Sequence, residues 1–237
     1  MNVLITAGGT VEKIDSIRSI VNFSTGKLGS LIADAFAMSE EVNHVYYLCN
    51  KTAVLPQTEK AEIIHISSVK CLQNTLTEII NRVSMDVIVH SMAVSDYRVK
   101  TVTTLSNIQS ASRFKAEIKP IMTQTQKIDS GIDGLTIILE KTPKIISTLR
   151  KLSSHSVIFG FKLLDSVPLD TLIDEGYRVL VNNGCSFVLA NDFSCIDDFR
   201  HVGYLIDEHK NFTKHDTKKE IADAIVAAAL AKRRSVQ

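Results

Sequence analysis

Short β-branched apolar runs alternate with stretches of helical periodicity along most of this chain. The first run, Asn2 to Thr6, leads into the glycine turn Gly8-Gly9, as expected of a buried strand followed by a tight turn. Comparable runs occupy residues 44–49, 62–66, 86–90, 135–139, 157–161 and 187–189. The alternation predicts a three-layer α/β fold, in which helices cover both faces of a mostly parallel sheet of about six or seven strands.

The segments between these runs have the spacing of helices with one apolar face. The first covers residues 28–36, and Ser24 or Thr25 is placed to cap it. Further helices are expected over residues 69–83, from near Pro143, from near Pro168, and from about Asp216 to the Lys-Arg-Arg close to the C-terminus.

Two segments do not fit the alternation. Residues 101–130 are rich in Ser, Thr and Gln and hold several lysines, which is too polar for the core of a sheet. Long loops in compact domains usually act as lids or binding loops, so we expect a protruding arm or flap here, in the form of a loose hairpin. Residues 203–212 are expected to form a second hairpin. We expect residues 1–237 to be one domain that carries this arm.

Charge and cysteine content exclude several classes of function. The net charge is +1 and the pI is about 7.7, so the chain lacks the broad positive field that binding to nucleic acid or an anionic membrane needs. Its four cysteines form no C-x-x-C pair and no zinc pattern. We see no charged-then-apolar leader and no apolar run of about 18 residues. We therefore expect a cytoplasmic protein that acts on a small molecule.

The strongest local signal is the segment from Asn22 to Gly29, at the start of the first predicted helix. Ser24 and Gly26 would point hydroxyl and N–H groups outward, where the helix dipole favours phosphate oxygens. The segment has neither the spacing of a Walker loop nor that of G-x-G-x-x-G. An ordinary capped helix explains this segment equally well. The turn Gly8-Gly9 favours phosphate binding, because ligands of open α/β sheets lie at the same edge.

Polar residues also follow other predicted strands. Asp96 comes after the strand at 86–90, and Asn191-Asp192 come after Ala190. Each fits an ordinary turn residue, but together at one edge of the sheet they could hydrogen-bond a base or ribose. Lys127, in the arm, is either a solvated lysine or a cation that closes over a triphosphate. His90 lies in an apolar run and is expected to be a core residue.

Several of these motifs occur together in one known family. They are Gly8-Gly9-Thr10, the run from Ile17 to Gly29, Ala93 to Tyr97, Lys127-Ile128, Gly160-Phe161-Lys162 and Ala190-Asn191-Asp192. In order and spacing they resemble the phosphopantothenate cysteine ligases, over roughly residues 1–195. The resemblance implies a Rossmann-like sheet and a homodimer in which the arm helps to form the partner's site.

The resemblance also implies a reaction. The carboxylate of 4'-phosphopantothenate attacks the α-phosphate of a nucleoside triphosphate, pyrophosphate leaves, and the amine of cysteine attacks the mixed anhydride, with Mg²⁺ required. By likeness Asn22 holds the acyl-nucleotide intermediate and Lys127 acts on the nucleotide's phosphates. The other matched positions are phosphate contacts at Gly8, Ser24, Gly26 and Gly29, a base contact at Asp96, and pocket residues Phe161 and Asn191. The metal ligands stay unknown.

The chain departs from parts of the family pattern. Bifunctional members carry an N-terminal flavin decarboxylase half, for which this chain has no room, so we expect a stand-alone bacterial type with a separate phosphopantothenoylcysteine decarboxylase. Fused enzymes have further lysines where this chain has Ile128-Asp129-Ser130 and Asn182-Asn183. Gly160 to Leu163 resembles the eukaryotic ligases, which use ATP. We favour CTP as the nucleotide, with ATP as the alternative.

Two other functions fit parts of the sequence. Residues 2–10 begin like the fold of an NAD(P)-dependent reductase, but the second strand ends in Cys49-Asn50, with no acid for a ribose hydroxyl and no arginine for a 2'-phosphate. A non-catalytic nucleotide-binding protein is the third hypothesis. Such a protein would tolerate replacement of Asn22 and Lys127.

Overall fold

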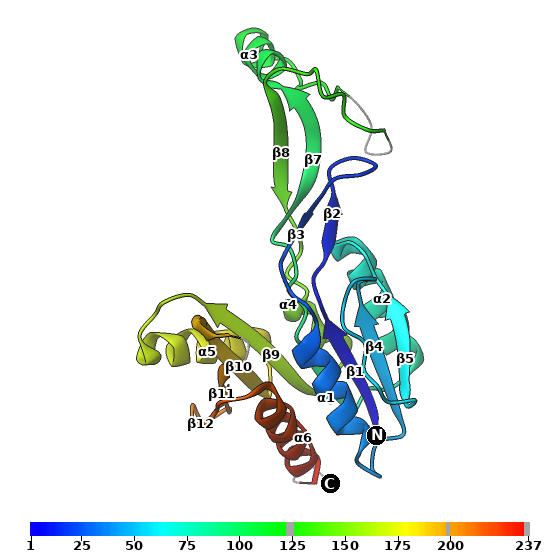
Figure 1. The fold of residues 1–237 in the computed structure, drawn as a ribbon, viewed down its shortest axis with the longest axis vertical. Coiled ribbons are helices and arrows are strands. Elements are labelled where there is room, and N and C mark those ends of the chain that lie inside the picture. The colour runs from blue at the N-terminus through cyan, green and yellow to red at the C-terminus, as the bar shows by residue number, and fades with distance from the viewer. Residues whose placement is uncertain (122–125, 198–199, 235–237) are drawn as a thin grey trace.

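An eight-stranded sheet forms the body of the molecule, and a two-stranded ribbon projects from it as an arm (Figure 1). The structure is a computed structural model that describes residues 1–121, 126–197 and 200–234. The parallel strands are β1 (Asn2–Ala7), β4 (His44–Cys49), β5 (Ala61–His65), β6 (Val87–His90), β9 (Val157–Leu164) and β10 (Phe187–Ile196). At one edge the antiparallel strands β11 (His201–Ile206) and β12 (Phe212–His215) complete the sheet.

The strand order places a switch point in the middle of the sheet. The order is β12-β11-β10-β9-β6-β1-β4-β5, so the chain moves outward from β1 to β5 and then returns to pair β6 with the other side of β1. Loops that follow β1 and β6 therefore leave the sheet side by side at its carboxyl edge. Ligands of open α/β sheets bind in the crevice at such a point.

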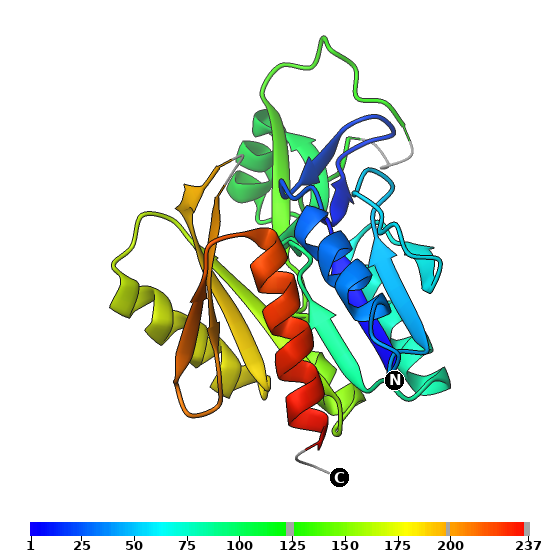
Figure 2. The same ribbon diagram turned by 60° about the horizontal axis from the view of Figure 1, so that its bottom comes forward.

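Helices cover both faces of the sheet, which confirms the predicted three-layer, Rossmann-like fold. On one face lie α1 (Lys27–Ala37) and α6 (Lys218–Arg234), which pack side by side (Figure 2). On the other lie α2 (Val69–Arg82), α4 (Ile146–Leu152) and α5 (Leu169–Asn183). Each layer buries its own apolar cluster against the β-branched strands between them. This burial is the main source of stability, at about 25 cal/mol for each Å² of apolar surface.

The arm corrects two expectations. It consists of β7 (Tyr97–Thr104), α3 (Leu105–Phe114) and β8 (Leu135–Lys141), with β7 and β8 antiparallel, so it is longer than residues 101–130. The prediction that residues 135–139 continue the parallel sheet is wrong, because this run pairs with β7 instead. A short β-branched run has the same local pattern in either place, and only the pairing partner distinguishes them.

The segment between β1 and α1 contains a hairpin. It comprises β2 (Val11–Lys13) and β3 (Ser19–Val21), and it reaches from the sheet toward the arm (Figure 1). A small apolar cluster joins the two, formed by Val99, Val102 and Ile128 with partly buried isoleucines of the hairpin and arm. The predicted hairpin near residues 203–212 is confirmed as β11 and β12. No helix in the described ranges is long and apolar enough to span a bilayer.

Candidate active site

Hydrogen bonds tie the loops after β1 and β6 together at the switch point. Ala93 donates its N–H to the carbonyl oxygen of Gly8 at 2.9 Å, and Thr10 donates its N–H to the carbonyl oxygen of Ala93 at 3.1 Å. The buried Thr10 hydroxyl contacts the Ser95 hydroxyl at 3.0 Å and accepts the Ser95 N–H at 2.9 Å. The two loops therefore form one rigid floor.

Glycines let the start of α1 and its preceding loop come very close to this floor. A Cβ on Gly9 would lie 2.5 Å from the carbonyl oxygen of Asn22, and one on Gly26 would lie 3.1 Å from the Gly8 nitrogen. Gly8 and Gly26 also have positive φ angles of 77° and 74°. A Cβ on Gly29 would lie 2.5 Å from the Ala7 Cβ. The structure thus brings Gly8, Gly26 and Gly29 together, as the sequence predicted, because only glycine permits this approach.

The cap of α1 differs from the prediction. The helix begins at Lys27, its N-cap is Gly26, and no side chain makes the usual cap hydrogen bond. Thr25 instead accepts the N–H of Lys27 at 3.3 Å, and Ser24 is half-buried in the loop before it. The prediction that Ser24 or Thr25 is the N-cap is therefore wrong. Gly26 is the N-cap, and its left-handed conformation turns the chain into the helix. First-turn N–H groups without intrahelical partners remain at this end, where the dipole favours an anion.

Asn22 lies at the edge of this crevice. It follows β3, is exposed, and donates its side-chain N–H to the carbonyl oxygen of Val94 at 3.3 Å. Its carboxamide is thereby held between the hairpin and the loop after β6. Such a group can offer a donor to charge that develops on a bound molecule.

Asp96 begins the arm and has a partner that the sequence did not suggest. Its carboxylate accepts a hydrogen bond from the Lys144 ammonium at 2.5 Å, and its backbone carbonyl accepts the N–H of Thr142. Both charged side chains are largely exposed, at 70% for Lys144 and 63% for Asp96. An exposed pair of this kind exchanges its partner at little energetic cost, so Asp96 stays available to a ligand.

Lys127 is exposed on the segment that packs on the tip of the β2–β3 hairpin. The next residue, Ile128, is buried and donates its N–H to Asp15 at 3.1 Å. Burial would raise the pKa of Asp15, but N–H groups of Ile17, Ile128 and Arg18 and the Arg18 guanidinium together lower it to about 2. The sequence analysis missed Asp15 and Arg18. The i, i+3 spacing of an acid and a base was the available signal.

Phe161 and Asn191 lie on the neighbouring strands β9 and β10. Phe161, on β9, is half-buried against the cluster beneath α1 and α6. Asn191 was expected to follow the end of a strand, but it lies inside β10 and is buried there. It donates its side-chain N–H to the carbonyl oxygen of Val202 at 3.0 Å. Because Val202 of β11 accepts this hydrogen bond, the polar Asn191 side chain can be buried within the strand. Asp192 accepts the Ser194 hydroxyl and the N–H groups of Val167 and Ser166, and these hydrogen bonds lower its pKa. The two N–H contacts also fix the loop after β9.

His90 is a core residue, as predicted. It is 7% exposed, and its Nδ1 lies 2.8 Å from the Thr6 hydroxyl. Burial lowers its pKa to about 4, so the imidazole is neutral at pH 7. It supports the floor of the crevice without taking part in it.

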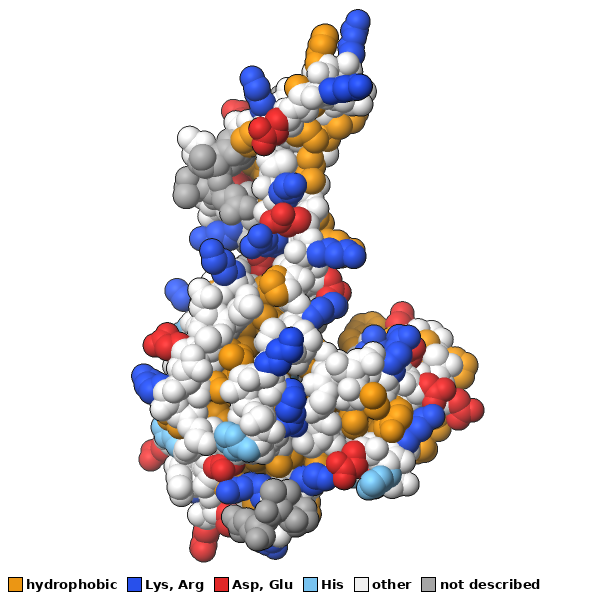
Figure 3. Space-filling model, turned by 180° about the vertical axis from the view of Figure 1, so that it is seen from behind, with side chains coloured by type: hydrophobic (Ala, Val, Ile, Leu, Met, Phe, Trp, Pro, Cys, Tyr) orange, Lys and Arg blue, Asp and Glu red, His pale blue; other side chains and the backbone are white. Residues whose placement is uncertain are grey.

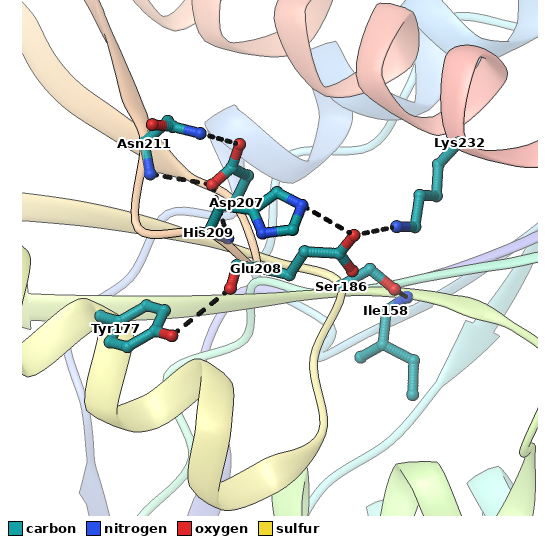
Figure 4. A network of polar contacts seen from close by, with 8 residues as sticks. All are labelled: Ile158, Tyr177, Ser186, Asp207, Glu208, His209, Asn211 and Lys232. Atoms are coloured by element: carbon teal, nitrogen blue, oxygen red, sulfur yellow. Dashed lines mark hydrogen bonds and ion pairs between the residues drawn. The ribbon is translucent and has the colours of Figure 1, made fainter. Parts of the chain in front are cut away.

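A second polar network lies at the opposite end of the sheet (Figure 4). In the turn between β11 and β12, Asp207 accepts the N–H groups of His209 and Asn211, while Glu208 pairs with Lys232 of α6 at 2.7 Å. An apolar hollow of about 320 Å³ lies beside it, between β12 and α6, and includes Phe187 at the start of β10. These contacts fasten α6 to the sheet at the amino ends of the parallel strands, far from the glycine turns.

Several known proteins are similar to this chain in fold and in sequence. A crystal structure of the DNA/pantothenate metabolism flavoprotein from Streptococcus pneumoniae is 33% identical, with a TM-score of 0.85 over 100% of both chains. The coenzyme A biosynthesis bifunctional protein CoaBC of Thermococcus kodakarensis is 30% identical over 94% of this chain. That match is 49% of the relative's length, so the chain spans about half of the curated relatives it matches.

A more distant structure shows the same fold. It is a Cab2 variant in complex with phosphopantothenate-cysteine, 18% identical, with a TM-score of 0.73. The model of the DNA/pantothenate metabolism flavoprotein C-terminal domain matches residues 1–113 and 106–232. These matches cover nearly all the elements described above, including the glycine turns, the hairpin and the arm, and the chain therefore belongs to the family of the DNA/pantothenate metabolism flavoprotein C-terminal domain.

Proposed function

We propose that this protein is a phosphopantothenate cysteine ligase, which joins 4'-phosphopantothenate to cysteine in coenzyme A biosynthesis at the expense of a nucleoside triphosphate. The observation that carries the proposal is the close approach of the Asn22 loop and the α1 start to the Gly8-Gly9 turn. Family membership supports it, as do the coenzyme A biosynthesis proteins among the relatives and the phosphopantothenate-cysteine bound by the Cab2 variant.

Two steps make up the proposed reaction. A carboxylate oxygen of 4'-phosphopantothenate forms a bond to the α-phosphorus of the nucleotide while the bond to pyrophosphate breaks. The amine of cysteine then forms the amide bond, a proton is lost from nitrogen, and the nucleoside monophosphate leaves. The leaving groups are stable anions, so the protein's task is to orient the reactants and to stabilise negative charge.

Each group of the site has a role in these steps. The glycine turns and the free N–H groups at the start of α1 bind phosphate oxygens, with Gly8, Ser24, Gly26 and Gly29 shaping that surface. Asn22 donates to the acyl-nucleotide intermediate, and Lys127 neutralises charge on the phosphates. Asp96 accepts hydrogen bonds from the base, for which it must release Lys144. Phe161 contributes apolar surface, and buried Asn191 supports the pocket from behind.

We favour CTP over ATP as the nucleotide. Magnesium fits the site as an ion carried by the triphosphate, because Mg²⁺ is usually held by substrate phosphates, water and one or two carboxylates. The described residues gather no group of three His, Cys, Asp or Glu side chains that could form a separate cage. When bound, the ion would withdraw charge from the phosphates.

We further propose that the protein is a homodimer joined through the arm. The arm exposes apolar side chains, which Figure 3 shows among its Lys and Arg residues. They are Tyr97, Leu105, Phe114, Leu135 and Leu139, exposed by between 41% and 72%. An apolar surface of this kind on a projecting element is typical of an interface. All four cysteines are free thiols, which suits a reducing cytoplasm.

A reductase function has less support. Asn50 directly follows β4, and its side-chain oxygen would lie 3.0 Å from a Cβ on Gly8. The space in which a dinucleotide fold places an acid for the ribose is therefore filled by an amide packed on the glycine turn.

The test is product formation by purified protein supplied with Mg²⁺, 4'-phosphopantothenate, cysteine and either CTP or ATP. We expect CTP-dependent release of pyrophosphate, and we expect Asn22→Ala to lower kcat by about 10²–10³-fold, as for the loss of one donor to a developing anion. Asn43→Ala, which removes an exposed amide outside the site, should match the parent protein. If neither nucleotide is consumed, the proposed activity is wrong.

A further inference from the structure

The tip of the β2–β3 hairpin contains a buried carboxylate with an unusual number of donors. Asp15 is 1% exposed, and its Oδ1 accepts the N–H groups of Ile17 at 2.8 Å and Arg18 at 2.6 Å. Its Oδ2 accepts the Arg18 guanidinium at 2.6 Å and the Ile128 N–H at 3.1 Å. Three of these donors are local to the turn. The fourth comes from a residue 113 positions along the chain.

The long-range contacts lie on both sides of Lys127. Ser16 donates its N–H to the carbonyl oxygen of Gln126 at 3.4 Å, and Arg18 reaches the carbonyl oxygen of Ile128 at 3.5 Å. Ile128 itself is 2% exposed in the cluster shared by hairpin and arm. The backbone that carries Lys127 is thus fixed before and after it, while the Lys127 side chain remains exposed.

We propose that Asp15 is a positioning residue, which clamps the Lys127 segment to the hairpin tip and so sets where the Lys127 ammonium can act. The role of Lys127 itself rests on the proposed ligase function. The same hairpin continues through β3 to Asn22, four residues after Arg18, or about 13 Å of extended chain. The clamp therefore links the two side chains assigned to charge stabilisation through one short, hydrogen-bonded element.

The charge of Asp15 is needed for this arrangement. Each oxygen accepts two hydrogen bonds, so both oxygens are committed as acceptors. An asparagine would place an NH₂ group against two donors at one of these positions. Asp15→Asn should therefore weaken the clamp, and Asp15→Ala should remove it. Burial would raise the pKa of Asp15, but hydrogen bonds from the three N–H groups and the Arg18 guanidinium lower it to about 2, so the folded protein favours the ionised carboxylate.

Trypsin offers a direct measurement, because it cleaves after lysine and thus cuts the Lys127–Ile128 peptide itself. Cleavage of a native protein tracks the population of the open form. We expect Asp15→Ala to raise the rate at this bond by about tenfold or more, since a hydrogen bond to a charged acceptor is lost. Cleavage after Lys115, at the end of α3, serves as the internal reference. Lys127→Ala removes the site and identifies the fragment.

Asp129→Ala is the matched control. It removes a carboxylate two residues from Lys127, but that carboxylate is exposed and, among the described residues, accepts only the local N–H of Gly131. Its cleavage rate after Lys127 should stay near that of the parent protein. The rate of cleavage after Lys127 in Asp15→Asn should lie between the rates in the parent protein and in Asp15→Ala. Asp15→Asn also provides a second variant if Asp15→Ala fails to fold. Equal cleavage in Asp15→Asn, Asp129→Ala and the parent would overturn the clamp.

Kinetics test the consequence for Lys127. We expect Asp15→Asn to lower kcat for nucleotide consumption with less change in KM for 4'-phosphopantothenate, and to have little further effect in a Lys127→Ala background. Effects that multiply in the double variant would overturn the positioning role. If the parent protein consumes no nucleotide, the ligase proposal fails alone, and trypsin cleavage still decides the clamp.

Discussion

The crevice at the sheet edge and the arm hold their functional groups by different physical means. At the crevice, Asn22 is held by backbone surfaces so close that a single Cβ on Gly9 would come within 2.5 Å of its carbonyl oxygen. On the arm, the segment that carries Lys127 is held by the hydrogen bond from the Ile128 N–H to Asp15 and by one small apolar cluster. Close packing resists any change of shape, whereas a few polar contacts can open and reform. The crevice should therefore behave as a rigid template and the arm as a separately stable element.

The largest expected effect tests whether the sheet and arm unfold together. Phe159 is fully buried in the sheet and stacks on Phe187, with ring centroids 5.0 Å apart. Phe159→Ala should lower the free energy of unfolding by about 3–5 kcal/mol, measured by denaturant titration. Ile128→Ala should leave the main transition nearly in place but speed amide hydrogen exchange in β7 and β8. A main transition shifted equally by both variants would show that the arm belongs to the same cooperative unit.

A second effect concerns the glycine packing of the crevice. Gly29→Ala would place a Cβ 2.5 Å from that of Ala7, and we expect it to lower the free energy of unfolding by about 1–3 kcal/mol through overpacking. The matched variant on the arm is Gly131→Ala, whose Cβ would meet, among the described residues, only the exposed Asp129 side chain, at 3.2 Å. That side chain can move, so thermal unfolding should be almost unchanged. A Gly29→Ala protein as stable as the parent would contradict the rigid template.

Burial lowers the pKa of both His90 and His201 to about 4, so the pH dependence of stability should arise partly beneath the crevice, at His90, and partly at the start of β11. As the pH falls below 6.5 the unfolded chain binds a proton at His90 first, because burial lowers the pKa of His90 in the folded state to about 4. The free energy of unfolding should fall by about 2 kcal/mol between pH 7 and pH 5 from this residue. His90→Gln should remove most of that fall, as measured by urea titration at the two pH values. If the free energy of unfolding differs between the two pH values as much in the variant as in the parent protein, the pH dependence comes from residues other than His90.

The smallest effect is expected at the surface of the arm. Arg98 and Glu140 form an ion pair at 2.7 Å across β7 and β8, with both side chains more than a third exposed. Glu140→Gln should change the free energy of unfolding by about 1 kcal/mol or less, because water and salt screen the pair. High salt should reduce even this difference. A larger effect would mean that the ribbon depends on surface charge rather than on its apolar cluster.

Much of the fold could be predicted because its signals are local. The β-branched runs predicted the parallel strands, and helical periodicity predicted the ends of α2 and the start of α6 to within a few residues. The run at 135–139 was placed wrongly, since β8 differs from a sheet strand only in its partner, β7. Gly26 was recognised as part of the α1 start, but its role as N-cap was not, because a positive φ is decided by contact with Gly8.

The sequence by itself determined the alternation of strands and helices, the glycines at the carboxyl edge of β1 and at the start of α1, and the family resemblance. Only the tertiary structure decided that Asn191 is satisfied inside the sheet by Val202 and that Asp15 clamps Ile128 across 113 residues. The physical reason is that periodicity and turn conformation depend on residues that are close together in the sequence. A buried polar group instead takes whichever partner the folded chain brings to it, because leaving it unsatisfied is costly.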